Sequence, residues 1–118
     1  MNTNDKTTVV LQVAFFKTEK GNEPVRLWLK ELPIEARKTI GTDIKTVQYG
    51  WPIGMPVVRK MDTGLWEVRS TTETGIARVL FTVVGDTMVL LHGFIKKSQK
   101  TPQEDIETAN KRKKLLTK

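Results

Sequence analysis

The chain has 118 residues, which suits one domain, and its net charge of +7 favours an anionic partner such as nucleic acid or an acidic protein. It contains no cysteine and one histidine, which argues against a disulfide framework and a zinc site of the usual ligands, so we expect no cofactor and no metal. No apolar run approaches the roughly 20 residues of a membrane helix, and the polar start lacks the regions of a signal peptide, so we expect a cytoplasmic protein without membrane contact.

The first part of the chain predicts one strand followed by two helices. Residues 9–16 are rich in β-branched and aromatic residues, which is typical of a strand. The segment EPVRLWLKEL, residues 23–32, has apolar residues at helical spacing, with Asn22 as the expected cap. Pro33 suits the start of a second helix, which ends where GWPIGMP, residues 50–56, predicts an irregular loop.

The second part predicts four strands and a last helix. Turn residues separate strand-like segments at 57–61, 65–71, 75–84 and 87–95, and such short connections indicate antiparallel hairpins. Pro102 begins the last helix, with Thr101 as its expected N-cap and Glu104 in the capping-box position. The residues expected on its buried side are Ile106, Ala109 and Leu116. The pattern predicts a single α+β domain over residues 1–118, with helices packed on one face of an antiparallel sheet.

Charged side chains are expected together on one face of this sheet. Side chains alternate across a strand, so Glu67 and Arg69 share a side of LWEVRS, and Arg78 lies opposite the apolar side of IARVLF. We therefore expect Glu67, Arg69 and Arg78 on an open sheet face. His92 and Lys96 share one side of the following strand.

A basic cluster follows the last strand. Lys96, Lys97 and Lys100 lie within five positions in HGFIKKSQKTP, and residues 96–118 hold eight Lys or Arg against three acids. We expect these three lysines at the rim of the charged face, where they would bind an RNA backbone. The alternative is a solvated basic tail that serves solubility.

A carboxylate beside two arginines suits RNA cleavage by the 2′-hydroxyl. This reaction needs a base for the hydroxyl proton, cations around the phosphate and an acid for the leaving oxygen. Glu67 is the candidate base, Arg69 and Arg78 are the candidate phosphate ligands, and Lys96 or His92 is the candidate acid. No metal is required.

Each of these candidates has a structural alternative. Glu67 and Arg69 could be a surface ion pair that contributes little. Arg78 is harder to explain in that way, because a charge in an apolar strand needs a partner or a function. His92 could be a hydrogen-bonded structural residue. The three tryptophans, Trp28, Trp51 and Trp66, are expected in the core and not as platforms for bases.

The segments LWEVRS, ARVLF and LLHGFIKKSQKTPQEDIETANKR resemble the RelE/ParE toxin superfamily, and most closely the phage-derived, HigB-type branch of type II toxin–antitoxin systems. The resemblance runs from about Val9 to Leu116. It implies a RelE-like fold, in which an N-terminal strand and two helices pack on a curved antiparallel sheet that is followed by a C-terminal helix. It also implies a toxin that cuts mRNA in the ribosomal A site without metal, and a helix-turn-helix HigA-type antitoxin as partner beside the ribosome and mRNA.

The superfamily's functional cations match positions of this chain. Its arginine after the first hairpin matches Arg78, a basic residue in the preceding strand matches Arg69, and its basic cluster before the last helix matches the three lysines. The sequence departs from the superfamily at two positions, and these differences leave the identity of the general base and of the general acid undecided. Glu67 stands where RelE-like enzymes carry a lysine, and the tyrosine that some members place near the C-terminus is absent from EDIETA.

The ParE branch shares this fold and poisons DNA gyrase, so fold alone does not choose the activity. The alternatives to a nuclease are therefore a non-enzymatic ParE-like inhibitor of DNA gyrase and a plain nucleic-acid-binding module. The basic cluster favours RNA.

Overall fold

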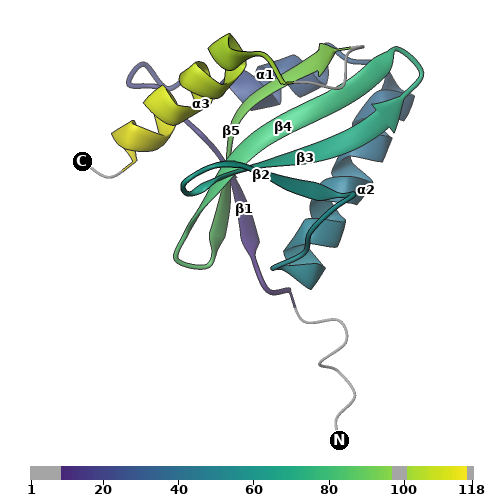
Figure 1. The fold of residues 1–118 in the computed structure, drawn as a ribbon. Helices are drawn as coiled ribbons and strands as arrows, with labels where there is room; N and C mark the ends of the chain where they lie inside the picture. The colour runs from purple at the N-terminus through teal and green to yellow at the C-terminus, as the bar shows by residue number, and fades with distance from the viewer. Residues whose placement is uncertain (1–8, 97–100, 117–118) are drawn as a thin grey trace, which may run out of the picture.

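The computed structural model of the protein describes residues 9–96 and 101–116. The elements follow one another along the chain as shown in Figure 1: β1 Gln12–Phe15, α1 Pro24–Lys30, α2 Ile34–Gly50, β2 Val58–Asp62, β3 Leu65–Thr72, β4 Gly75–Val84, β5 Thr87–Lys96 and α3 Gln103–Leu115. The predicted α+β class is confirmed. Among the helices of the described residues, none is long and apolar enough to cross a membrane.

The described strands form one mixed sheet in the order β1-β5-β4-β3-β2. The neighbours from β2 to β5 are antiparallel and are joined by short turns, as the turn residues predict. β1 instead runs parallel to β5, with Gln12 opposite Thr87 and Phe15 opposite Leu90. The prediction of a purely antiparallel sheet is therefore wrong at this edge. Turn residues predict the pairing only of strands that follow each other in the sequence. β1 and β5 are separated by most of the chain, so no turn pattern predicts their pairing.

Helices cover both faces of the sheet. Figure 1 shows α1 and α2 behind the strands and α3 in front of them. The core against α1 and α2 contains buried residues of both helices and of the sheet: Val25, Ile40, Ile44, Val47, Val68, Val79, Phe81 and Leu90, among others. A second core lies under α3 and contains Phe16, Leu65, Leu80, Val89, Leu91 and Ala109. The prediction that the helices share one face is wrong, because the central strands are apolar on both sides and each side needs a cover.

The expected buried side of the last helix is confirmed. Ala109 is fully buried, and Ile106 and Leu116 pack against the core under α3. The expected helix caps are wrong in two cases. The N-cap residue of α1 is Glu23 and not Asn22, and the N-cap residue of α3 is Pro102 and not Thr101.

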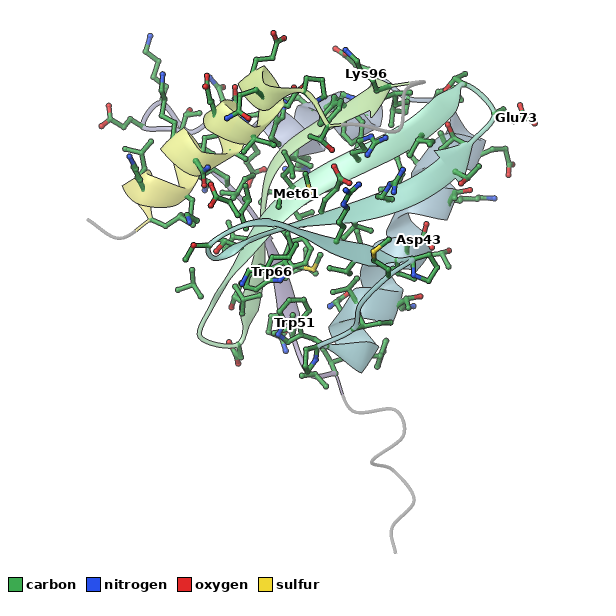
Figure 2. All side chains as sticks on the ribbon, viewed as in Figure 1. Asp43, Trp51, Met61, Trp66, Glu73 and Lys96 are labelled. Carbon is green, nitrogen blue, oxygen red and sulfur yellow. The ribbon has the colours of Figure 1, made fainter. Side chains whose placement is uncertain are left out.

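The tryptophans belong to the core, as expected. Trp51 meets the edge of Trp66 at 5.0 Å between ring centroids, and Figure 2 shows the two side chains close together. Trp28 packs against β5 at Gly93, where a Cβ atom would lie 2.5 Å from the indole ring. A side chain at position 93 would therefore push α1 away from the sheet.

Candidate functional site

The sheet register brings the predicted cations side by side. Arg69 on β3 lies opposite Arg78 on β4, and Arg78 lies opposite Phe94 on β5. Two arginines in directly opposed positions repel each other. Glu67 lies two residues before Arg69 on the same face, so its carboxylate is placed to offset this repulsion.

Glu67, Arg69, Arg78 and Thr101, which we call the Glu67 cluster, are joined by short polar contacts. Arg78 Nη1 donates to Glu67 Oε1 over 3.2 Å, and Arg69 Nε lies 3.8 Å from the same oxygen. The hydroxyl of Thr101 donates to Glu67 Oε2 and accepts from Arg78 Nη1 at 3.3 Å. Thr101 thus bridges both members of the central ion pair.

The expected open face is wrong for two of the three predicted residues. The side chains of Glu67 and Arg78 are 0% exposed, whereas that of Arg69 is 18% exposed. The start of α3 and Thr101 lie over the pair. The Thr101 hydroxyl is engaged with Glu67 and Arg78, which explains why it does not cap the helix. Arg78 therefore has the charged partner that an arginine in an apolar strand requires.

His92 lies on the same face of the sheet, but it contacts Asp105 and not the Glu67 cluster. It lies opposite Leu80, which lies opposite Glu67, so two strand spacings, roughly 10 Å, separate the backbones of Glu67 and His92. His92 Nε2 lies 2.6 Å from Asp105 Oδ1 on α3, and its ring stacks on Phe94 with centroids 5.6 Å apart. The hydrogen-bonded partner expected for a structural histidine is present, and the pair keeps some contact with solvent.

Two further cations lie on this face in exposed positions. Arg59 on β2 is opposite Glu67, and Lys96 ends β5 opposite Ile76, as Figure 2 shows for the end of that strand. Both residues are exposed. Lys97 and Lys100, the other members of the predicted RNA-binding cluster, lie outside the described residues.

A hollow of about 520 Å³ lies beside Arg69. Its lining comes from α2, the loop before β2 and the hairpin of β3 and β4: Thr39, Asp43, Pro56, Val57, Arg69, Thr71 and Ile76. The hollow gives a small molecule or a nucleotide an approach to this arginine that the buried Arg78 does not have.

The helix α3 contacts the sheet at two more places. Arg112 Nη1 donates to the carbonyl oxygen of Leu91 over 2.7 Å, and its guanidinium lies over the ring of Phe16. Burial there lowers the pKa of Arg112 from its ordinary value, since desolvation disfavours the charged form. Asn110 Nδ2 donates to Asp62 Oδ2 over 3.0 Å.

The sequence interpretation missed three residues of this face, Thr101, Asp105 and Arg59. The sequence predicts only a capping role for Thr101, because the residue before a proline at a helix start usually has that role. Asp105 carries a local signal only for the helix start, where an acidic residue in the first turn is favourable, and this signal does not indicate its contact with His92. Among residues 9–96 and 101–116, no three His, Cys, Asp or Glu side chains come together as a metal-binding set.

Comparison with known protein families identifies a match for most of the chain. A family model described as "Phage derived protein Gp49-like (DUF891)" matches residues 27–114. That segment includes α2, strands β2 to β5 and nearly all of α3, and so it contains every described residue of the candidate site. No curated protein matches the chain. The family match spans well over half of the 118 residues, and the chain therefore belongs to the Gp49-like family of phage-derived proteins.

Proposed function

We propose that this protein is the toxin of a type II toxin–antitoxin system, with a RelE-like fold, that inhibits translation by cutting mRNA on the ribosome. Membership of the phage-derived Gp49-like family and the resemblance to the HigB-type branch both support this proposal. The net charge of +7 supports a polyanionic substrate. In this proposal a helix-turn-helix antitoxin of the HigA type neutralises the protein in the cell.

The observation that carries the proposal is the position of Arg69. It lies at the border of the buried Glu67–Arg78 pair, it keeps part of its side chain exposed, and it lines the hollow beside α2. A guanidinium binds two phosphate oxygens at once. Arg59 and Lys96 add exposed positive charge on the same face of the sheet. This arrangement suits the backbone of a single RNA strand that contacts Arg59, Arg69 and Lys96 where α3 leaves them accessible.

The burial of Glu67 suggests a division of roles among the candidates. Glu67 has no exposed surface and holds Arg69 and Arg78, so we assign it to positioning the arginines instead of taking a proton. His92 and Lys96 lie on either side of Arg78 along β5, at the diagonal positions of the register. In this proposal they serve as base and acid on opposite sides of a phosphate.

The reaction is then a transesterification within the RNA. Neutral His92 takes the proton of the 2′-hydroxyl, and the 2′-oxygen forms a bond to phosphorus. The bond from phosphorus to the 5′-oxygen breaks, and Lys96 gives a proton to that oxygen. The products are a 2′,3′-cyclic phosphate and a 5′-hydroxyl end, and Arg69 stabilises the charge that develops on the phosphoryl oxygens.

A translation extract tests the proposal. Added protein should produce new mRNA ends that map to translated codons, and naked transcript at the same concentration should be cut poorly. Arg69→Gln should lower the cleavage rate by about 10²-fold, as expected when a donor to a developing charge is removed. Arg37→Gln changes an exposed arginine on α2 and is the matched control. Equal cleavage by the Arg69 and Arg37 variants would contradict the assigned site, and inhibition of translation without new ends would contradict the nuclease.

A second candidate is a ParE-like protein that binds DNA gyrase without catalysis, or a plain nucleic-acid-binding module. The complete burial of Glu67 and Arg78 favours it, because a binding protein needs no reactive group at its surface. Gyrase supercoiling assays distinguish the two classes. Inhibited supercoiling together with intact mRNA would favour the gyrase inhibitor.

A further inference from the structure

The contact between His92 and Asp105 is short and links two elements. His92 Nε2 lies 2.6 Å from Asp105 Oδ1, and the two side chains are 21% and 17% exposed. The histidine belongs to β5 and the aspartate to the first turn of α3. The contact is therefore a tertiary one, and it exists only when α3 is docked on the sheet.

The chemistry of the two groups determines the direction of this hydrogen bond. An ionised carboxylate only accepts hydrogen bonds, so Nε2 of His92 must carry the proton that it shares with Asp105. In the neutral ring the other nitrogen, Nδ1, is then unprotonated and is an acceptor. A carboxylate in this position also stabilises the imidazolium that forms when Nδ1 takes a proton.

The orientation of the ring is further restricted by its neighbours. Phe94, two residues along on the same face, stacks on the imidazole at an angle of 30° between the planes. Asp105 is itself held because the chain just before α3 is fixed at Thr101, which bridges Glu67 and Arg78. The Glu67 cluster thus sets the position of Asp105, and Asp105 sets the ring.

We propose that Asp105 is a positioning residue for His92: it keeps the proton of the neutral imidazole on Nε2 and leaves Nδ1 as the proton acceptor for the substrate. This inference rests on the proposed function, since it assigns to Asp105 a part in RNA cleavage. It makes docking of α3 a condition for activity, because without α3 the ring loses both its orientation and its defined tautomer.

The tautomer is measurable directly, because the chain contains one histidine and its ring nitrogens give unambiguous ¹⁵N signals. In the full-length protein the neutral ring should show a protonated Nε2 and an unprotonated Nδ1. Asp105→Ala should abolish this preference and give a mixture of the two tautomers. Glu107→Ala, an exposed carboxylate on the same helix, is the matched control and should leave the ring signals unchanged. A protonated Nδ1 in the unaltered protein would overturn the inference.

A double-mutant cycle tests whether Asp105 acts through His92. Asp105→Ala should lower the single-turnover cleavage rate by roughly 10²-fold, the lower end of what a proton-transfer group contributes. Ribosome affinity should stay within about twofold, because neither residue is assigned to binding. With His92→Ala already present, adding Asp105→Ala should lower the rate by less than about threefold, since the two changes remove one function. Equal losses in both backgrounds would show that Asp105 acts independently of His92 and would overturn the inference.

The tautomer measurement and the cleavage measurement test the inference and the proposed function separately. If the unaltered protein cuts no mRNA, the proposed function fails, and the catalytic part of this inference fails with it. A tautomer that changes in Asp105→Ala would still show that the aspartate orients the ring. If Asp105→Ala does not fold, Asp105→Asn keeps the size of the side chain and removes its charge, and the same comparison of rates in both backgrounds applies.

Discussion

The pair of Glu67 and Arg78 is the most tightly enclosed polar contact of the site. Both side chains are 0% exposed and meet at 3.2 Å, with Thr101 bonded to each. A buried ion pair contributes little net stability over an apolar pair, but the removal of one partner leaves a charge without compensation. The pair is therefore sensitive to truncation whether or not it takes part in chemistry.

Glu67→Ala should lower the free energy of unfolding by about 3–5 kcal/mol, because it leaves the Arg78 guanidinium buried without its carboxylate. Urea denaturation followed by circular dichroism measures this loss. Glu73→Ala removes an exposed carboxylate at the turn between β3 and β4 and should change stability by less than about 0.5 kcal/mol. A loss of less than 1 kcal/mol for Glu67→Ala would show that water reaches the pair on a small rearrangement.

At the scale of elements, α3 docks on the sheet through polar contacts as well as apolar ones. Its buried apolar surface is small, with Ala109 fully buried and Ile106 and Leu116 partly so. Contacts to β5 by Asp105 and Arg112 and to the end of β2 by Asn110 add to this surface. Since such contacts respond to charge, the docking of α3 should respond to pH.

Asp62, the last residue of β2, is the contact partner of α3 whose protonation should matter. The backbone N–H of Thr63 and then the side chain of Asn110 lower its pKa from the ordinary value. Because the pKa of Asp62 is lower in the folded state, its ionised form stabilises the fold at every pH above the unfolded-state pKa, near 3.9. This stabilisation is lost as the pH falls from the unfolded-state pKa through the lower, folded-state pKa. The contribution is thus present at neutral pH and absent in strong acid.

Asp62→Asn should therefore lower the melting temperature by a constant amount between about pH 5 and 7, and the difference from the unaltered protein should shrink below about pH 4. Thermal melts across this range provide the measurement. Asn110→Ala should reduce the same difference, because it removes the second cause of the shift. A difference that persists unchanged into strong acid would contradict the role of the Asp62 carboxylate.

At the scale of the whole molecule, charge and shape act together. Positive charge is in excess over the whole chain, but the exposed Arg59 and Lys96 and the partly exposed Arg69 share the α3 face of the sheet with the buried Glu67–Arg78 pair. Other basic residues lie on the opposite side of the molecule along α2. A polyanion that binds at the candidate site should therefore depend on the first group more than on the second.

Replacing Arg59, Arg69 and Lys96 by glutamine lowers the net charge from +7 to +4. The salt dependence of ribosome binding, plotted as log affinity against log salt, should become shallower by a slope of roughly 2 to 3. Replacing Arg37, Lys38 and Lys45 of α2 removes the same charge from the other side and should change the slope by less than about 1. Equal changes in the salt slope for the two triple variants would show that the basic residues serve solubility in general and not binding at the candidate site.

The sequence determined the class of the protein and most of its strands. Hydrophobic alternation and turn residues depend on local geometry, so the hairpins from β2 to β5 and the two-helix segment before them were predictable. Alternation also predicted that Glu67, Arg69 and Arg78 share a face, because side-chain direction along a strand follows from position alone.

Only the tertiary structure decided what covers that face. The placement of α3 on the second side of the sheet depends on the summed apolar surface of several strands, which no local pattern reports. For the same reason the sequence predicted an open Glu67 and a capping Thr101, whereas the fold buries the first and uses the second to bridge an ion pair. Long-range contacts bring together Thr101 and Glu67, and His92 and Asp105, and they decide which groups meet a substrate and which support it.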